Sequence, residues 1–191
     1  MKISITNLSI TLCMAMLASA VTAAPVADDE RVDIDLRRTT LIVADIENSL
    51  RFYRDALGMK VIYDNMIRTP RSAKTDAEAD ISRRLVFVRA NDDTVGIVGL
   101  LEYTKPLKKV RAPEPEDFST GSAVLLFNTS NVEERFAAAS QVPGVEVLDP
   151  PTDVNYPSYD GKSVIHVRVS TMRDPDGFLV ELNQLLSELD N

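Results

Sequence analysis

The feature that most constrains this chain is an internal repeat with an offset of 86 positions. At that offset, and without a gap, apolar residues align with apolar residues and glycine aligns with glycine. The matched pairs are Leu41 and Phe127, Ile46 and Val132, Leu50 and Phe136, Gly58 and Gly144, Val61 and Val147, and Ile62 and Leu148. A chain that repeats a unit of this length is expected to fold as two similar units that pair their sheets around a shared concavity.

The first copy has the pattern of a strand, a helix and a second strand. The β-branched run 39–43 predicts a strand, and Asp45 is a suitable N-cap for a helix over 46–57. Gly58 then supplies the residue that tolerates a left-handed conformation where a helix ends. Segments 59–63, 85–88 and 94–103 predict three further strands, the last two as a hairpin.

The second copy repeats this order. Segment 123–127 predicts a strand, Asn131 is a suitable cap for a helix that runs to about residue 141, and Gly144 follows. Segments 145–148, 163–172 and 178–182 predict the remaining strands. The sequence therefore predicts an α+β fold of two tandem βαβββ units. It leaves one segment open, the polar stretch 64–84, which reads either as a lid over a cavity or as a disordered insertion.

The N-terminus has the pattern of a cleaved export signal. Lys2 precedes an apolar run over 3–17, and either Val21 and Ala23 or Ala18 and Ala20 supply the small residues that a signal peptidase requires. The alternative is an uncleaved N-terminal anchor. We expect a signal peptide over 1–23, a polar linker over 24–35, a domain over 36–187 and a secreted or periplasmic location. The only cysteine, Cys13, lies within the signal, so neither disulfide nor thiolate chemistry is expected in the mature chain.

The charge pattern bears on partners. The formal net charge is −8 and no basic stripe follows any segment, which argues against nucleic acid as a partner. After cleavage of the signal no membrane association is expected. Phosphate-binding, dinucleotide-binding and serine-nucleophile motifs are absent from the sequence.

Two motifs at opposite ends of the predicted domain resemble a known family. Segment 41–59, with the sequence LIVADIENSLRFYRDALGM, is similar to the opening of the glyoxalase I and bleomycin-resistance group of the vicinal oxygen chelate superfamily. Segment 174–182, DPDGFLVEL, is similar to the last turn and strand of that group. The resemblance covers residues 36–187. It implies two βαβββ units around a shared cavity, and is compatible with a homodimer.

The resemblance also implies where a metal would bind. Metal-dependent members use a His and a Glu from each half. The two His positions correspond to Arg38 and Val124, and the two Glu positions to Glu102 and Glu181. Two carboxylates alone would make a weak, mostly hydrated site, so no cofactor is expected, with a divalent metal on Glu102 and Glu181 as the alternative.

Two other residues enter the predicted site. The single histidine, His166, lies in a predicted strand and away from the family's ligand positions, so it is either a structural residue or a member of the pocket. Arg38 stands where a metal ligand would be. It either forms an ion pair with Glu102 or Glu181 inside the cavity or lies in water at the start of a strand.

These observations leave two functions. The first is an exported protein that binds a small organic molecule between its two units without a metal. The alternative is a metal-dependent lyase-, isomerase- or dioxygenase-type enzyme in which Glu102 and Glu181 hold the ion. Whether the chain is an enzyme stays open. The predicted pocket residues are Arg38, Glu102, Val124, His166 and Glu181.

Overall fold

The computed structural model describes residues 27–108, 120–158 and 161–187. The predicted signal peptide, 1–23, lies outside the described residues. In the described ranges no helix has the length and apolar character that crossing a membrane requires.

The two halves of the chain form two units with the same order of elements. After a short 3₁₀ turn, η1 (Asp28–Glu30), the first unit contains β1 (Arg38–Val43), α1 (Ile46–Leu50), its π-helical continuation η2 (Arg51–Ala56), β2 (Lys60–Thr69), β3 (Ile81–Arg89) and β4 (Ile97–Lys105). The second contains β5 (Val124–Asn128), α2 (Val132–Ala139), β6 (Glu146–Pro157), β7 (Val164–Arg173) and β8 (Leu179–Leu185).

Each unit contributes one four-stranded mixed sheet, and the strand orders correspond. The first sheet has the order β1-β4-β3-β2 and the second β5-β8-β7-β6. In both sheets the first pair, β1 with β4 and β5 with β8, is parallel and the other pairs are antiparallel. The prediction of two βαβββ units is therefore confirmed.

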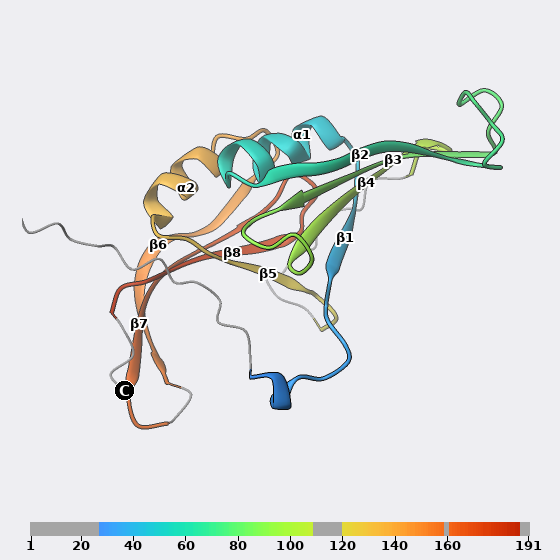
Figure 1. The fold of residues 1–191 in the computed structure, drawn as a ribbon. Coiled ribbons are helices and arrows are strands. Elements are labelled where there is room, and N and C mark those ends of the chain that lie inside the picture. The colour runs from blue at the N-terminus through green and yellow to red at the C-terminus, as the bar shows by residue number, and fades with distance from the viewer. Residues whose placement is uncertain (1–26, 109–119, 159–160, 188–191) are drawn as a thin grey trace, which may run out of the picture.

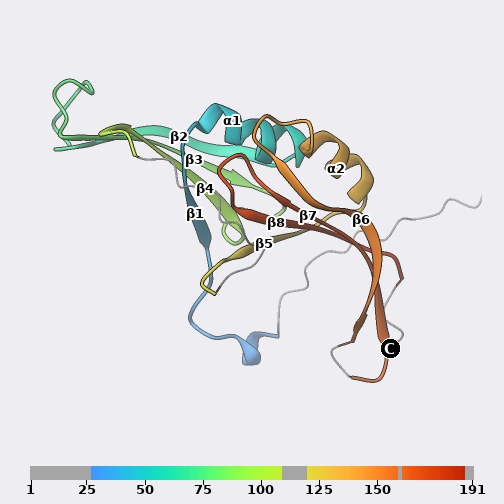
Figure 2. The ribbon, with the colours of Figure 1, turned by 180° about the vertical axis from the view of Figure 1, so that it is seen from behind.

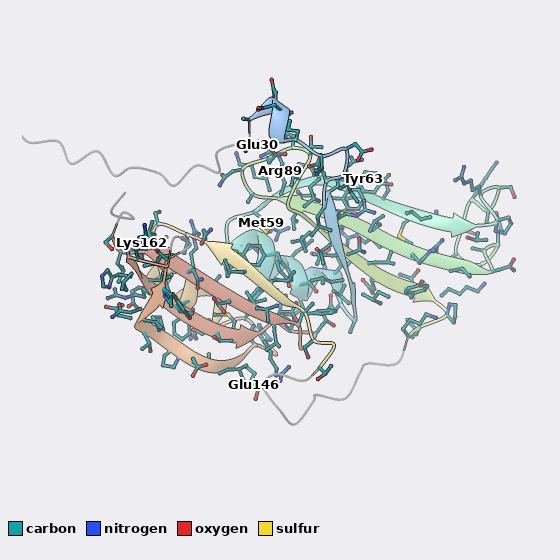
Figure 3. The ribbon with its side chains drawn as sticks, turned by 90° about the horizontal axis from the view of Figure 1, so that it is seen from below. Glu30, Met59, Tyr63, Arg89, Glu146 and Lys162 are labelled. Atoms are coloured by element: carbon teal, nitrogen blue, oxygen red, sulfur yellow. The ribbon has the colours of Figure 1, made fainter. Side chains whose placement is uncertain are left out.

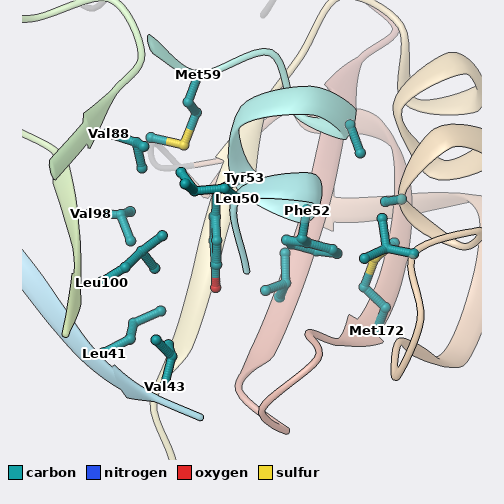
Figure 4. Packing of buried hydrophobic residues seen from close by; sticks show 14 of the residues in the cluster. Leu41, Val43, Leu50, Phe52, Tyr53, Met59, Val88, Val98, Leu100 and Met172 are labelled. Atoms are coloured by element: carbon teal, nitrogen blue, oxygen red, sulfur yellow. The ribbon is translucent and has the colours of Figure 1, made fainter. Parts of the chain in front are cut away.

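Both helices lie on the same side of the two sheets (Figures 1 and 2). The buried core fills the space between the helices and the sheets and draws on both units. In Figure 4, Tyr53 lies between the side chains of the first sheet and Phe52, and Phe52 lies toward Met172 of the second sheet. Phe52, Tyr53 and Met172 have no measurable exposure, so the two units share one core rather than having one each.

The predicted helix boundaries are confirmed by their caps. Asp45 accepts hydrogen bonds from the backbone N–H groups of Glu47 and Asn48, and Asn131 accepts one from Glu134. The glycines that follow the helices have positive φ, +80° at Gly58 and +88° at Gly144. These local signals fix the ends of the helices because they satisfy backbone groups that would otherwise lack partners.

In each unit one arginine holds the helix to its sheet, and the two arginines do so in the same way. Arg84 on β3 binds Asp64 on β2 and Glu47 on α1, at 2.7 and 2.6 Å. In the second unit, Arg168 on β7 binds Asp153 on β6 and Glu133 on α2, at 2.6 and 3.6 Å.

The glutamates in these two arginine clusters, Glu47 and Glu133, are themselves 86 positions apart. The repeat therefore extends to polar contacts.

The turn between β7 and β8 ties the two units together. Asp174 accepts a hydrogen bond from the hydroxyl of Tyr53, at 2.7 Å, inside the core. Asp176 accepts from the backbone N–H of Ala44 at 2.7 Å and from the Ser49 hydroxyl at 3.1 Å. Burial raises the pKa of Asp174 to about 6, even though hydrogen bonds to its carboxylate favour the ionised form.

Segment 64–84 forms neither a lid over a cavity nor a disordered insertion, the two alternatives that the sequence left open. Its ends lengthen β2 and β3, and its middle forms a loop organised by Asp76, which accepts hydrogen bonds from Arg68 and Ser82. The resulting hairpin projects beyond the sheet and away from the second unit (Figure 1). It therefore does not cover a site between the units.

Candidate functional site

Each sheet has a helix-covered face and a face that carries no helix. On β1, Leu41 and Val43 are buried under the helices, so alternation places Arg38, Thr40 and Ile42 on the other face. We call the helix-free face of each sheet its open face, and Figure 3 shows both from that side. Of the two faces of each sheet, the open face is the one that neither of the described helices α1 and α2 covers.

The open face of the second sheet is apolar near its parallel edge. Val124 and Leu126 on β5 lie there, 41% and 53% exposed. Glu181 on β8 is opposite Leu126 and shares its face, since its neighbours Val180 and Leu182 are buried in the core. The structure thus places two predicted pocket residues, Val124 and Glu181, on the same open face.

The pairing registers show which residue of the first sheet corresponds to Glu181. In the second sheet Leu126 is opposite Glu181, and in the first sheet Thr40 is opposite Gly99. Leu126 and Thr40 are 86 positions apart, the offset of the repeat. The counterpart of Glu181 is therefore Gly99, which has no side chain, and not Glu102.

Glu102 lies on the opposite face of its sheet. It is two residues after buried Leu100 and therefore shares the helix-covered face with it. Its Oε2 accepts a hydrogen bond from the backbone N–H of Ile46, at 3.2 Å, at the start of α1. Glu102 therefore does not share the open face with Arg38. The resemblance matched it by its position in the strand, which does not show which face the side chain occupies.

His166 also lies outside the open faces. It shares the helix-covered side of β7 with Arg168 and Met172, near the end of the sheet that the helix does not reach, and it is exposed. Its Nδ1 lies 2.6 Å from the side-chain oxygen of Asn155 on the neighbouring strand. His166 therefore contacts Asn155 on the neighbouring strand and does not lie on the open face.

Arg38 lies on the open face and forms no ion pair with either glutamate. Its guanidinium carbon is 4.2 Å from the ring centroid of Phe87, and its Nε donates a hydrogen bond to the Thr40 hydroxyl at 3.0 Å. Glu102 is on the other side of the sheet, and no ion pair joins Arg38 to Glu181 among the described residues. The predicted ion pair is therefore wrong, and Arg38 instead contacts Phe87 and Thr40 on the open face.

The residues at the four metal positions do not fit a metal ion. The resemblance and the register together place Arg38, Gly99, Val124 and Glu181 there. A cation, a residue without a side chain and a hydrocarbon supply no donor, and a single carboxylate falls short of the three protein ligands that catalytic sites of this kind use. The described residues also contain no cluster of three His, Cys, Asp or Glu side chains.

Two aromatic residues of the open face were missed by the sequence reasoning. Phe87 on β3 is opposite Gly99, and Tyr63 on β2 is opposite Phe87. Their rings are stacked, with centroids 4.7 Å apart and planes 22° apart. Successive strand residues point to opposite faces, so Phe87 could have been separated from Val86 and Val88 in the sequence. Tyr63 is opposite Phe87 only because of a β-bulge, which no sequence signal indicates.

A separate hollow of about 400 Å³ is lined by Met66, Ile67, Arg68, Arg71 and Ala73, at the outer end of the β2–β3 hairpin. None of the predicted pocket residues contributes to it. The open faces are therefore the candidate site.

Comparison with known proteins identifies the family of this fold. The sequence profile of the Glyoxalase/Bleomycin resistance protein/Dioxygenase superfamily matches residues 35–182. The chain belongs to this superfamily. No curated protein sequence matches it.

Solved structures of the superfamily share the fold at low sequence identity. A glyoxalase family protein from Bacillus cereus has a TM-score of 0.63 at 12% identity, over 84% of this chain and 100% of that one. A glyoxalase/dioxygenase from Nostoc punctiforme has a TM-score of 0.52 at 18% identity, over 87% and 99%. Glyoxalase I from Zea mays has 0.51 at 21% identity, over 78% of this chain and 45% of that one. At these identities the likeness is one of fold.

Proposed function

We propose that this superfamily member is an exported protein that binds a small organic molecule on the open faces of its sheets without a metal ion. The observation that carries the proposal is the replacement of metal donors at three of four positions, by Arg38, Gly99 and Val124. The open faces keep their place in the superfamily fold but carry different chemistry.

The exposed apolar side chains of these faces support ligand binding. Ile42 on β1 is 54% exposed and Leu126 on β5 is 53% exposed, although both are large and apolar. Removing apolar surface from water contributes about 25 cal/mol per Å², so a ligand that covers these side chains gains binding energy without a metal. Tyr63 and Phe87 add flat aromatic surface to the same face of the first sheet.

The alternative, a metal-dependent lyase, isomerase or dioxygenase, loses the residue it depended on. Its ion needed both Glu102 and Glu181, but Glu102 accepts a hydrogen bond from the backbone of α1 on the other side of the sheet. Only Glu181 then remains as a ligand, and one carboxylate does not favour this function.

Two measurements on the mature chain without a histidine tag test the proposal. After incubation with Mn, Fe, Co, Ni or Zn and dialysis, mass spectrometry should find no stoichiometric metal. A small-molecule library should contain compounds that raise the melting temperature, and Leu126→Arg should abolish the rise. Val147→Arg is the matched control, because Val147 is comparably exposed, at 42%, but is opposite the core residue Met172.

A stoichiometric ion that is lost on Glu181→Ala would overturn the metal-free proposal. Compounds whose effect survives Leu126→Arg would overturn the location of the site.

Export is tested separately. N-terminal sequencing of the protein from a periplasmic or secreted fraction should find a chain that starts after Ala23 or Ala20. A chain that keeps Met1 in the cytoplasm would overturn this part of the proposal.

A further inference from the structure

Three planar groups form a row across the open face of the first sheet. The guanidinium of Arg38 lies over one face of Phe87, at 4.2 Å, and the ring of Tyr63 is stacked against Phe87 at 4.7 Å. The row crosses the whole sheet, from β1 at one edge to β2 at the other. Tyr63 is 36% exposed, so the row is accessible from solvent.

Gly99 makes the first of these contacts geometrically feasible. It lies on β4, between the strands that carry Arg38 and Phe87. A Cβ at this position would be 3.1 Å from Cδ of Arg38 and 2.9 Å from Oγ1 of Thr40. Because Gly99 has no side chain, the stem of Arg38 can pass over β4 and bring its guanidinium to Phe87.

A bulge in β2 makes the second contact. The register between β2 and β3 shifts between Val61 and Tyr63, so that Tyr63 is opposite Phe87. Without the additional residue, the aliphatic Ile62 would be in that place. Bulges commonly redirect a side chain in this way, and here the effect is to extend an aromatic surface.

The donors of Arg38 are only partly used. Its Nε donates to Thr40, and among the described residues its terminal Nη groups take part in no ion pair or hydrogen bond. Arg54, Arg84 and Arg168, by contrast, each bind a carboxylate within 2.7 Å. The chain is acidic, with 29 Asp and Glu against 21 Lys and Arg, but no carboxylate is paired with Arg38 among the described residues.

From this arrangement we infer that the ligand of the open face is a planar organic carboxylate. Its carboxylate accepts two parallel hydrogen bonds from the Nη groups of Arg38, a geometry that guanidinium groups favour. Its flat apolar part lies against the exposed side chains beside the row, Ile42 among them. The inference rests on the proposed function and adds a charge preference and a residue that sets it.

Two contacts restrict the conformation of the Arg38 side chain. The hydrogen bond to Thr40 fixes Nε, and the ring of Phe87 fixes the plane of the guanidinium, so little side-chain freedom is lost when an anion binds. A lysine would keep the charge but lose both the planar contact and the paired donors. Arg38 is thus a specificity-determining residue for the anionic group.

The test compares matched ligands that differ in charge. A panel of aromatic carboxylates and their carboxamides, including 2-naphthoate with 2-naphthamide, is titrated by calorimetry into the mature chain. We expect the carboxylates to bind about tenfold more tightly, the effect of one charge-assisted pair at a partly exposed site. Arg38→Met should remove this difference while the carboxamides bind as before, and Arg38→Lys should keep only part of it.

Arg54→Met is the control, because it removes an equal charge from the helix side, where Arg54 binds Asp55. It should bind both ligands as the unchanged protein does. Equal affinity for each carboxylate and its carboxamide would overturn this inference and leave the proposed function intact. Failure of every carboxylate in the panel to bind would overturn the inference as well, and the proposed function would then be decided by the library screen alone. The thermal unfolding of Arg38→Met checks that the variant is folded.

Discussion

Glu102 and Gln184 occupy equivalent places in the two units and make the same hydrogen bond. Oε2 of Glu102 accepts from the backbone N–H of Ile46 at 3.2 Å, and Oε1 of Gln184 accepts from that of Val132 at 3.0 Å. Each donor is the first residue of a helix, where backbone N–H groups lack partners within the helix. Glu102 therefore stabilises the start of α1.

The first prediction follows from this equivalence. Glu102→Gln should leave the free energy of unfolding nearly unchanged, because Gln184 shows that an amide oxygen suffices. Glu102→Ala should lower it by about 1 kcal/mol, as expected for the loss of one helix-capping acceptor. Urea denaturation measures both. Loss of ligand affinity without loss of stability in Glu102→Ala would contradict the structural role.

The second prediction concerns the four metal positions. Arg38→His, Gly99→Glu and Val124→His, combined with the native Glu181, recreate the two His and two Glu of the metal-dependent relatives. We expect this triple variant to retain one equivalent of Zn, Co or Ni after dialysis, measured by mass spectrometry. The double variant Arg38→His with Val124→His should retain far less, because Gly99 supplies no ligand.

These two variants separate the two assignments of the fourth ligand. If Glu102 were that ligand, the double variant would already have a complete set and would bind as tightly as the triple variant. Equal retention by both would therefore refute the assignment of Gly99.

The third prediction concerns the space above Gly99. Gly99→Ala places a Cβ 2.9 Å from Oγ1 of Thr40 and 3.1 Å from Cδ of Arg38, so both side chains must move. We expect a loss of about 1–3 kcal/mol in the free energy of unfolding, typical of overpacking, and weaker binding of carboxylates. Adding Thr40→Ala should recover part of the stability. A double-mutant cycle in urea that shows full additivity would contradict a steric cause.

The fourth prediction concerns the pH dependence of stability. Burial raises the pKa of Asp174 from its ordinary value of 3.8 to about 6, so between these values the folded chain binds more protons than the unfolded chain. The contribution of Asp174 is therefore complete below pH 3.8 and is lost as the pH rises through 6, by about 3 kcal/mol in total. Asp174→Asn removes the titration. The difference in unfolding free energy between the two proteins should fall over this range.

Tyr53→Phe is the second variant in this experiment. The Tyr53 hydroxyl donates to the ionised Asp174 and lowers the pKa of that carboxyl, so its removal should move the fall to higher pH. A fall that does not move would show that the hydrogen bond does not act on the titration of Asp174.

Much of the fold followed from the sequence because its signals are local. The repeat, the caps Asp45 and Asn131, and the glycines at 58 and 144 each act within a few residues of their position. The predicted strands were too short where a strand continues through polar and charged residues. β2 continues from the predicted end at residue 63 to Thr69, because an edge strand needs only backbone pairing on one side and tolerates polar side chains.

The site was less accessible to sequence reasoning because it depends on which face each side chain occupies. The resemblance pointed to Arg38, Val124 and Glu181, and the structure has all three on the open faces. Glu102 follows two consecutive leucines, and His166 lies in a strand whose apolar residues do not mark a single face. The equivalence of Gly99 and Glu181 needed the pairing register, which only the folded sheet provides.

The described strands of the two sheets share no backbone pairing. The units are joined instead by side-chain contacts, such as those of Tyr53 with Asp174 and of Arg135 with the carbonyl of Ala56. The two sheets are therefore held together by side chains and not by a continuous backbone ladder. A rotation of one sheet against the other would leave every backbone hydrogen bond within the sheets intact, but would have to rearrange side-chain contacts across the shared core.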